Sequence, residues 1–321
     1  MKIVISLGAS SLPYASICIR SLADKLQGDQ QIHLLTDSPQ ERIQLQEAFA
    51  DISRINVYWS DELWADPGNA MLRFPGIVRL REGHPCWRKL TDPMLLARDG
   101  DEVVVIDPDV YFLRPFVFEP VGDTSLRLIW QRANCLLPYS VVDAAFTQDI
   151  ALADHVDIGI AQYRAPLDLE WLDRAITALG DLPTNVLHVE AILWSCMAMR
   201  MGGGYLDSNL WRCWENSQTK RIKKKLGATP AQMLALEDLS RAIAFHAGGV
   251  AKYWLAAPGS EEQIKRQAAL PSTASESRKA LKPFVPFTAK KFEWLKKRGR
   301  WLDALGYYRF VGATAPASIG R

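Results

Sequence analysis

The sequence predicts an α/β protein, and three observations carry that prediction. Segments rich in aliphatic and β-branched residues alternate with segments that carry apolar residues at helical spacing. The chain has 321 residues, enough for one large domain or for a domain of roughly 200–250 residues with an appendage. Its 48% hydrophobic and 23% charged residues are ordinary for a globular protein. Alternation of this kind builds a sheet that is covered by helices.

The first 106 residues supply strands and helices in turn. Strands are predicted over 2–7, 31–38, 54–59 and 103–106, with helices over 13–26, 39–52 and 89–98. Pro13 suits the first turn of the first helix. The stretch 60–85 contains Pro67, Gly68, Pro75 and Gly76, which predict an irregular loop near a site.

The remainder continues the alternation. Strands are predicted over 126–131, 156–163 and 241–245, with helices over 139–153, 168–180, 188–200 and 218–242. Glycines 202–204 end the helix over 188–200. From about Pro271 the composition becomes that of a linker, and a basic and aromatic segment follows.

The bulk numbers favour some classes of protein over others. A net charge of +2 gives no field suited to nucleic acid, so no nucleic-acid partner is expected. The five cysteines are odd in number and form no CxxC or Cys/His spacing, which indicates reduced thiols. No long apolar leader and no run of 18 apolar residues occurs. We therefore expect a cytoplasmic protein.

The most informative stretch is VVVIDPDVYF, where Asp107 and Asp109 end a run that should be a buried strand. Open α/β sheets place ligands at the carboxyl ends of their strands. In an extended segment, residues i and i+2 face the same side, so both carboxylates can meet one cation. Hard oxygen ligands suit Mg²⁺ or Mn²⁺. Two solvated aspartates in a strand-end turn would explain the pair alone equally well.

A second stretch, HAGGVAKYW, favours the cation. His246 could supply an imidazole ligand to the same ion. Gly248 and Gly249 would let backbone N–H groups approach phosphate oxygens, and Lys252 adds a point charge suited to a diphosphate. Trp254 is a candidate pocket wall. A structural histidine is the alternative for His246 taken alone.

Together the two stretches resemble the retaining GT-A glycosyltransferases of the galactosyltransferase/glycogenin type, which are similar to glycosyltransferase family 8. In that family an Asp-x-Asp and a later His-x-x-Gly-x-x-Lys hold a divalent cation and a nucleotide-sugar diphosphate. The resemblance covers roughly residues 2–255. It implies a Rossmann-like, mostly parallel central sheet flanked by helices. It also implies Mn²⁺ or Mg²⁺ on Asp107, Asp109 and His246, with Asp107, Gly249 and Lys252 at the diphosphate.

Three further positions follow from the resemblance. Lys89 stands about where the family carries a donor-contacting Arg. Asp157 takes the place of a family Asn, and Glu190 takes the place of a Gln near the sugar. These two acids are the candidate catalytic residues, because a carboxylate beneath the sugar ring stabilises oxocarbenium character. The alternative role of Asp157 is a strand residue paired with Lys or Arg, and that of Glu190 is a charge at a helix N-terminus, where the helix dipole favours it. Retention of configuration is implied by the family alone.

The loop after the first strand departs from the family pattern. Family members often carry an acid there that contacts the base or ribose, and LGASSLPY has none. Recognition of the nucleotide would then depend on the backbone and on residues of this loop: Leu7, Gly8, Ser10, Ser11 or Tyr14. A UDP-sugar is the favoured donor. The acceptor would be a saccharide or a lipid-linked glycan.

We predict three regions: a GT-A domain over 1–258, a linker over 259–287 and a basic, aromatic helical extension over 288–321. Residues 278–300 hold nine Lys or Arg and one acid, interleaved with aromatic residues. Such a helix suits the anionic inner face of a membrane, where each cation contributes about 1 kcal/mol. A helix that packs on the domain with a solvated basic face is the alternative.

Two rival functions remain open at this point. A non-catalytic relative would bind nucleotide sugar or glycan and keep the fold. A phosphatase of the haloacid dehalogenase type also has Asp-x-Asp after a strand, but it expects Thr or Val where Tyr111 stands. The pattern favours a metal-dependent hexosyltransferase over both.

Overall fold

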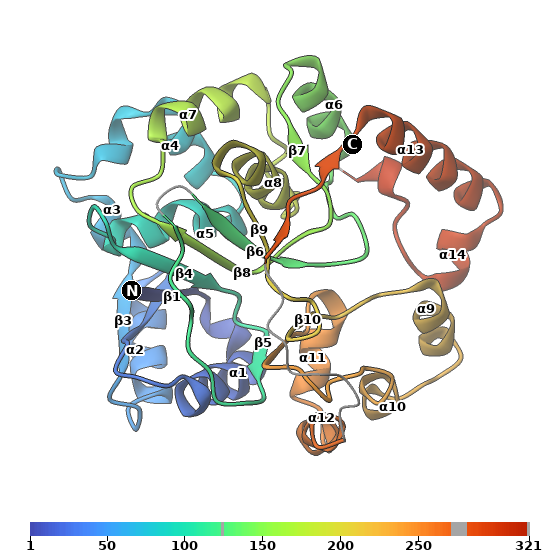
Figure 1. Cartoon of the computed structure of the whole chain (residues 1–321), viewed down its shortest axis with the longest axis horizontal. Coiled ribbons are helices and arrows are strands. Elements are labelled where there is room, and N and C mark those ends of the chain that lie inside the picture. Colours follow the sequence, from blue (N-terminus) through green and yellow to red (C-terminus); the bar gives the residue numbers. More distant parts are fainter. Residues whose placement is uncertain (123–124, 271–280, 320–321) are drawn as a thin grey trace.

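The computed structural model describes residues 1–122, 125–270 and 281–319, and an eight-stranded sheet runs through its centre (Figure 1). In spatial order its strands are β12 (Lys282–Pro283), β9 (Gly203–Tyr205), β6 (Leu126–Trp130), β8 (Val156–Arg164), β4 (Glu102–Ile106), β1 (Lys2–Ser6), β2 (Ile32–Thr36) and β3 (Ile55–Trp59). Only β8 and β12 among these strands run against the rest. The predicted α/β class with a mostly parallel central sheet is confirmed.

Both faces of this sheet are buried. In β1, Ile3 and Ile5 join one hydrophobic core, while Val4 between them joins a second core on the opposite face. All five residues of β4 are buried. A parallel strand covered on both faces needs a continuous apolar run, and VVVI supplies one. The two aspartates that follow it are therefore held at a rigid edge.

Helices cover the two faces separately (Figure 1). The first core includes side chains of α1 (Leu12–Lys25), α2 (Pro39–Ala48), α10 (Pro230–Leu234), α11 (Lys252–Leu255) and α12 (Ser260–Ala268). The second includes side chains of α4 (Pro75–Arg81), α5 (Arg88–Thr91), α6 (Tyr139–Thr147), α7 (Leu169–Ala178), α8 (Val189–Met201) and α13 (Ala289–Ala304). The remaining helices are α3 (Ser60–Trp64), α9 (Gln218–Lys225) and α14 (Tyr307–Val311).

A three-stranded sheet lies beside the large one. It orders β10 (Trp211–Cys213), β11 (Ala244–His246) and β5 (Val110–Phe112). The register pairs His246 with Val110 on one side and with Cys213 on the other. Residues more than 130 positions apart in sequence are thereby brought to one place. A two-stranded pair, β7 (Leu152–Ala153) and β13 (Pro286–Phe287), completes the sheets.

The prediction of an irregular loop over 60–85 is wrong in part, because α3 and α4 form there. Pro75 begins α4 instead of breaking it, since proline is compatible with a first helical turn. The buried Arg81 guanidinium fixes the region: Nε donates to Asp92 Oδ1 at 2.8 Å and an NH₂ group to Asp61 at 2.8 Å. The predicted helix over 89–98 is also shorter, and 3₁₀ geometry replaces it over Asp92–Leu96.

Two of the long predicted helices end earlier than expected. The helix expected over 139–153 ends at Thr147, and Leu152 and Ala153 pair as β7. The helix expected over 218–242 is interrupted by Gly227, whose φ is +92°, and restarts at Thr229 with a capping box. A left-handed glycine and an N-cap are ordinary helix boundaries, and apolar spacing alone did not reveal them.

The linker predicted over 259–287 needs correction. Residues 260–268 form α12, where Ile264 is buried in the first core and Glu261 accepts from Tyr111 Oη at 3.1 Å. Lys282 and Pro283 form β12 at the edge of the large sheet. Residues 271–280 lie outside the described residues, and the proposed division into regions stays a prediction.

The predicted C-terminal helix is present as α13 and packs on the domain. Phe292 is buried against Tyr139, Phe146 and Phe287. Lys291 also pairs with the buried Asp154. None of the helices in the described ranges combines the length and apolarity needed to cross a membrane.

Candidate functional site

The predicted site residues gather at one edge of the large sheet. Asp107 follows β4 directly, and its backbone N–H donates to Gly159 O at 2.9 Å. Because β8 runs against β4, its first residues lie where β4 ends, which brings Asp157 to the same edge. The small sheet adds His246 at the end of β11. A strand of opposite direction thus supplies a residue that a parallel strand would have placed at the far edge.

Asp107, Asp109 and His246 form a compact group of ligand atoms. His246 Nε2 lies 3.2 Å from Asp109 Oδ1 and 3.7 Å from Asp107 Oδ2. The ligand atoms of all three lie within 4.8 Å of one another. Asp109 Oδ1 is buried and accepts no hydrogen bond within the described part of the chain, despite the nearby ring. One imidazole and two hard oxygens, one of which accepts no hydrogen bond, suit a divalent cation.

His246 is oriented from behind by Asp157. Its Nδ1 lies 2.7 Å from Asp157 Oδ1, which directs Nε2 toward the two aspartates. A carboxylate on the far nitrogen of a metal-binding histidine fixes the ring and raises its basicity. Gly159 leaves room for this contact, because a Cβ there would lie 2.5 Å from His246 Cγ and Nδ1. The glycine is required by the close approach of the ring.

The charges of this group compensate one another. Burial lowers the pKa of His246, but the carboxylates of Asp157 and Asp109 outweigh it and raise that pKa well above its ordinary value. Burial conversely raises the pKa of Asp157, and the His246 charge outweighs it to leave that pKa low. Without a metal, an imidazolium is therefore the positive charge beside the aspartates. A metal ion would need the neutral ring and would displace that proton.

Lys89 lies on the other side of Asp107. Its ammonium is 2.7 Å from Asp107 Oδ1 and 3.2 Å from Glu190 Oε2. Both Lys89 and Glu190 are nearly inaccessible, and Glu190 sits in the first turn of α8. Burial, with the nearby charge of Asp107, raises the pKa of Glu190 to about 8 against the opposing effect of Lys89. One ammonium between two carboxyl groups leaves one of them able to hold a proton.

The loop after β1 and the start of α11 form a third part of the site. Tyr14 Oη donates to Ser11 Oγ at 2.9 Å, and Lys252 Nζ lies 5.5 Å above the Tyr14 ring. Burial lowers the pKa of Lys252, but Tyr14, Asp109 and Asp107 outweigh it and raise that pKa. Gly249 has a φ of +64°, which a residue with a side chain rarely adopts. Lys252 therefore stays charged beside the two aspartates.

The other predicted residues of that loop are Leu7, Gly8 and Ser10. Leu7 is buried, and its N–H extends the β1–β2 ladder to Leu35 O at 2.9 Å. Gly8 is packed near Glu41, whose Oε1 accepts from Ala9 N at 2.9 Å. Ser10 is exposed. An acid from α2 therefore lies beside this loop, and both of its oxygens accept hydrogen bonds, from Ala9 N and from Thr36 Oγ1.

Sequence reasoning missed Cys213. Its thiol donates to Asp157 Oδ2 at 3.2 Å, and burial raises its pKa, so the sulfur keeps its proton. Asp157, Cys213 and His246 together form a second group of potential ligand atoms. Gly159 was missed as well, although an isolated glycine inside a strand does signal close approach of another group. No comparable sequence signal marks Cys213.

Four of the tryptophans are core residues. Trp87, Trp194, Trp211 and Trp214 are all buried. Trp254 packs edge-on against Trp214, with ring centroids 5.0 Å apart. Trp130, at the end of β6, is only half-buried and lines a pocket with Arg212.

Comparison with known proteins adds likeness of structure alone. No family model and no curated relative matches the chain. Mouse xyloside xylosyltransferase 1 is similar in structure, with 8% identity and a TM-score of 0.48 over 77% of this chain and 97% of that one. Galactosyltransferase LgtC, solved with donor and acceptor sugar analogues, shows 15% identity and a TM-score of 0.43 over 86% and 98%.

The bifunctional glycosyltransferase WbbM shows 12% identity and a TM-score of 0.47, over 83% of this chain and 51% of its own. At such identities a similar backbone path does not transfer an activity, since one fold hosts many chemistries. The function of this chain must therefore be argued from its own side chains.

Proposed function

We propose that the chain is a metal-dependent glycosyltransferase. It would move a hexose from a nucleotide diphosphate sugar, with UDP favoured, to a saccharide or lipid-linked glycan. The observation that carries the proposal is the convergence of Asp107, Asp109 and His246 beside Lys252 at the carboxyl edge of the sheet. Two carboxylates, an imidazole and a free ammonium suit one divalent cation and one diphosphate better than a structural ion pair.

The donor would lie across this edge. Asp107, Asp109 and His246 would hold Mn²⁺ or Mg²⁺, and the bound cation would neutralise charge that develops on the leaving diphosphate. Lys252 would contact the phosphates as a point charge, with the backbone of Gly249 beside it. The nucleoside would lie on Leu7, Gly8, Ser10 and Tyr14, near the end of β1.

The sequence predicted the same catalytic role for Asp157 and Glu190, and we propose a different role for each. Asp157 has both oxygens engaged, by His246 and Gly159 N on Oδ1 and by Cys213 on Oδ2, so we assign it to positioning the histidine. Glu190 stands beside Lys89 on the other side of Asp107. We assign Glu190 to the sugar face, where a carboxylate stabilises an oxocarbenium-like centre, and Lys89 to holding it there. Retention of configuration is part of this proposal through the family resemblance.

A thermal-shift experiment tests the proposal. UDP and GDP, and their sugars, are each added with and without Mn²⁺ to the wild-type chain and to Asp109→Ala. We expect stabilisation by a nucleotide diphosphate only with metal, and no such stabilisation of the variant. A shift that is independent of metal would contradict the coordination. Hydrolysis or transfer assays on the stabilising sugar then separate an enzyme from a non-catalytic binder.

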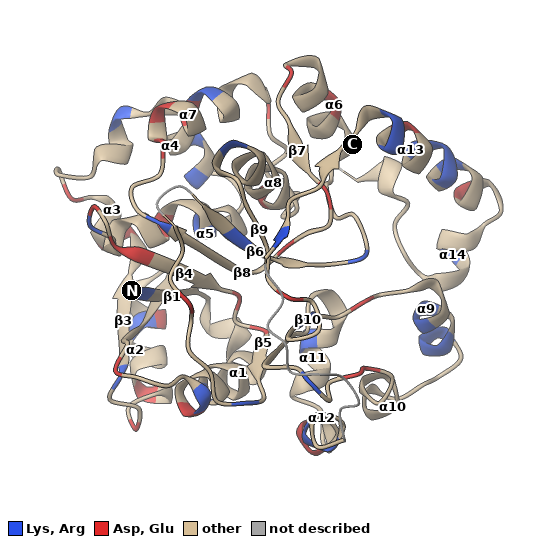
Figure 2. Ribbon diagram, viewed as in Figure 1, with Lys and Arg blue, Asp and Glu red and all other residues tan. Residues whose placement is uncertain are grey.

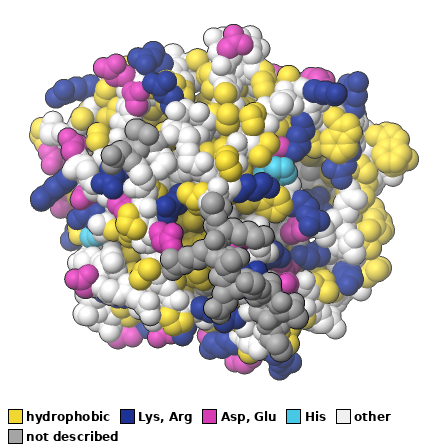
Figure 3. All heavy atoms as spheres, viewed as in Figure 1, with side chains coloured by type: hydrophobic (Ala, Val, Ile, Leu, Met, Phe, Trp, Pro, Cys, Tyr) yellow, Lys and Arg dark blue, Asp and Glu magenta, His cyan; other side chains and the backbone are white. Residues whose placement is uncertain are grey.

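We also propose that α13 touches an anionic membrane surface. Trp294 and Trp301 are 56% and 64% exposed, and Leu305 just beyond the helix is 63% exposed. Lys and Arg lie along the same helix, and hydrophobic side chains stand beside them at the right edge of the molecule (Figures 2 and 3). Flotation with vesicles of phosphatidylglycerol, compared with phosphatidylcholine, tests this. Equal flotation with both lipids, or none, would exclude an electrostatic anchor.

A further inference from the structure

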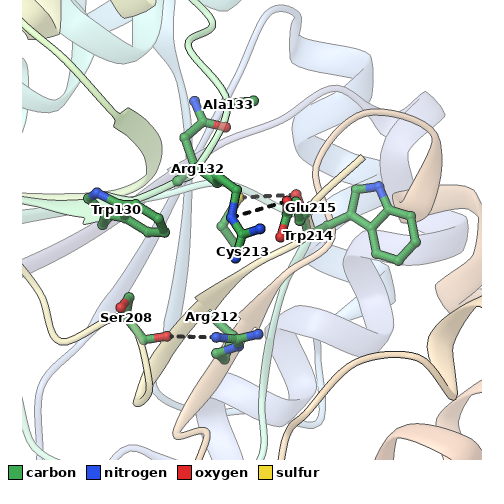
Figure 4. A pocket seen from close by; sticks show the side chains of 9 residues that line it. Trp130, Arg132, Ala133, Ser208, Arg212, Cys213, Trp214 and Glu215 are labelled. Carbon is green, nitrogen blue, oxygen red and sulfur yellow. Dashed lines mark hydrogen bonds and ion pairs between the residues drawn. The ribbon is translucent and has the colours of Figure 1, made fainter. Parts of the chain in front are cut away.

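A pocket opens beside the metal-ligand group and is not used by the donor as described. It lies between the end of β6 and strand β10 and opens to solvent (Figure 4). Its lining includes Trp130, Arg132, Ser208, Arg212, Cys213 and Glu215. Cys213 belongs to both places, because its thiol donates to the Asp157 carboxylate that orients His246. A molecule in this pocket that contacts Cys213 is therefore separated from Asp157, the residue that orients His246, by Cys213 alone.

The pocket contains more positive than negative charge. The Arg132 guanidinium lies 3.3 Å from Glu215, with the two side chains 73% and 32% exposed. Arg132, in the loop just after β6, and Arg212, in β10, both line this space (Figure 4). Two guanidinium groups and one carboxylate leave one positive charge uncompensated within the lining. Like charges directed at one space cost energy unless an anion joins them.

Arg212 has unused hydrogen-bonding capacity. One of its terminal NH₂ groups donates to Ser208 O at 3.3 Å, whereas its buried Nε–H has no acceptor among the described residues. The acids whose pKa its charge lowers have closer partners: Glu237 pairs with Lys220, and Asp238 accepts from Ser240 Oγ at 2.7 Å. Guanidinium groups bind phosphate and carboxylate oxygens in bidentate fashion. Arg212 therefore has donor capacity left that an anion in the pocket could use.

Trp130 supplies the apolar wall of the same space. The Trp130 side chain is half-buried. The His155 ring is tilted beside it, with 5.3 Å between the two centroids, and Lys282 Nζ lies 5.9 Å from the centroid of the Trp130 ring. Aromatic faces next to polar groups are typical of sites that bind a ligand with one apolar face and one polar edge. A sugar ring that carries an anionic substituent has both.

We infer that this pocket binds a saccharide acceptor through an anionic substituent, a phosphate or a carboxylate, held by Arg212 and Arg132. The word acceptor rests on the proposed function, whereas anion binding by the pocket does not. Glu215 competes with the substituent for Arg132 and so sets how tightly it is held. The neutral part of the sugar would lie toward Trp130, with Cys213 marking the direction of the metal site.

The first experiment measures binding by titration calorimetry, with no donor present. The probes are methyl glucoside 6-phosphate, methyl glucuronide and methyl glucoside, which differ only in the substituent at carbon 6. We expect at least one charged probe to bind about tenfold tighter than the neutral glucoside, because charge-assisted hydrogen bonds are roughly twice as strong as neutral ones. The stronger of the two charged probes identifies phosphate or carboxylate. Equal binding of all three, or of none, would overturn the inference.

Variants of opposite expected sign guard against misfolding. Arg132→Gln with Arg212→Gln should abolish the preference for the charged probe, whereas Glu215→Gln should strengthen binding of that probe by a few-fold. A gain cannot arise from loss of fold. Arg174→Gln is the matched control, because Arg174 is 67% exposed on α7 and pairs only loosely with Glu170 at 3.7 Å. It should leave all three affinities unchanged.

Failure of this inference can be separated from failure of the proposed function. Metal-dependent stabilisation by UDP is recorded on the same wild-type and variant preparations. If UDP binding is intact and charge discrimination is absent, only the anionic pocket is wrong. If UDP never binds but the charged probe does, the pocket stands and the proposed donor chemistry falls.

Discussion

Two buried acids flank Asp107 and Asp109, and their surroundings differ in a way that separates their functions. On one side Asp157 is fully engaged by an imidazolium, which leaves its pKa low. On the other side Glu190 shares a single lysine with Asp107, and burial raises its pKa to about 8. Burial alone disfavours both charges, so the difference comes from the partner. This difference is the basis of the proposed roles, in which Asp157 orients His246 and Glu190 serves the sugar face.

Replacement of Glu190 should have the largest effect on turnover. Glu190→Gln keeps the shape and removes the ionisable carboxyl group, so above pH 8, where Glu190 is ionised, we expect kcat to fall by about 10²–10³, the range seen when one electrostatic stabiliser is lost. Metal-dependent stabilisation by UDP should persist, since Asp107, Asp109 and His246 are untouched. Steady-state kinetics with the best donor, together with thermal shift, measure both. Turnover close to wild type would remove Glu190 from the sugar face.

Asp157→Asn probes the opposite side and should change a different quantity. An amide can still accept from Nδ1–H but carries no charge, so metal affinity should fall about 10–100-fold, as for other partners of metal-binding histidines. At saturating Mn²⁺ we expect kcat near the wild-type value. A metal titration of activity separates the two parameters. A loss of kcat that excess Mn²⁺ fails to restore would return Asp157 to the catalytic role predicted from the sequence.

The distinction between these sides could be predicted only in part. The metal-ligand group follows from two local motifs, DPD and HAGGVAK, each placed at the end of an apolar run. The same alternation of apolar runs predicted the central sheet. The contacts of Asp157 depend on β10, β11 and the antiparallel β8, whose pairings join residues 213, 246 and 157. Nothing in the spacing of those residues signals such long-range pairing.

The divided helices and the helices in 60–85 were missed for a different reason. Their boundaries depend on one-residue features, such as the cap at Thr229 or the buried pairing of Arg81 with Asp92. Apolar periodicity averages over about a dozen residues and does not resolve these features. The same limitation affected the linker predicted over 259–287, because residues 260–268 form α12, which the buried Ile264 and the contact of Glu261 with Tyr111 anchor.

Gly159→Ala tests the geometry of the Asp157 side directly. The added methyl would lie 2.5 Å from two atoms of the His246 ring, so the ring must move. We expect a loss of about 1–3 kcal/mol in the free energy of unfolding, the usual cost of an overpacked core, with weaker Mn²⁺ binding. Gly299→Ala is the control, since the closest contact of its Cβ would be Tyr308 Oη at 3.8 Å. In α13 that change should be neutral or stabilising. Unchanged Mn²⁺ binding in Gly159→Ala would show that the ring position is not critical.

The smallest expected effect is a pH dependence of stability on the Glu190 side. The folded pKa of about 8 lies above the ordinary 4.5, so the native state holds a proton that the unfolded state releases between these values. Stability from this group is full below pH 4.5 and is lost as pH rises toward 8, with a slope of at most about 1.4 kcal/mol per pH unit.

Because Glu190→Gln lacks this titration, the wild type should lose about 1 kcal/mol or more of unfolding free energy relative to the variant between pH 6 and pH 8. Urea denaturation at both values measures the difference. Glu170→Gln, on the exposed face of α7, should follow the wild-type profile. Parallel pH profiles for the wild type and Glu190→Gln would mean that Lys89 keeps Glu190 ionised, and the two sides of the site would then be electrostatically alike.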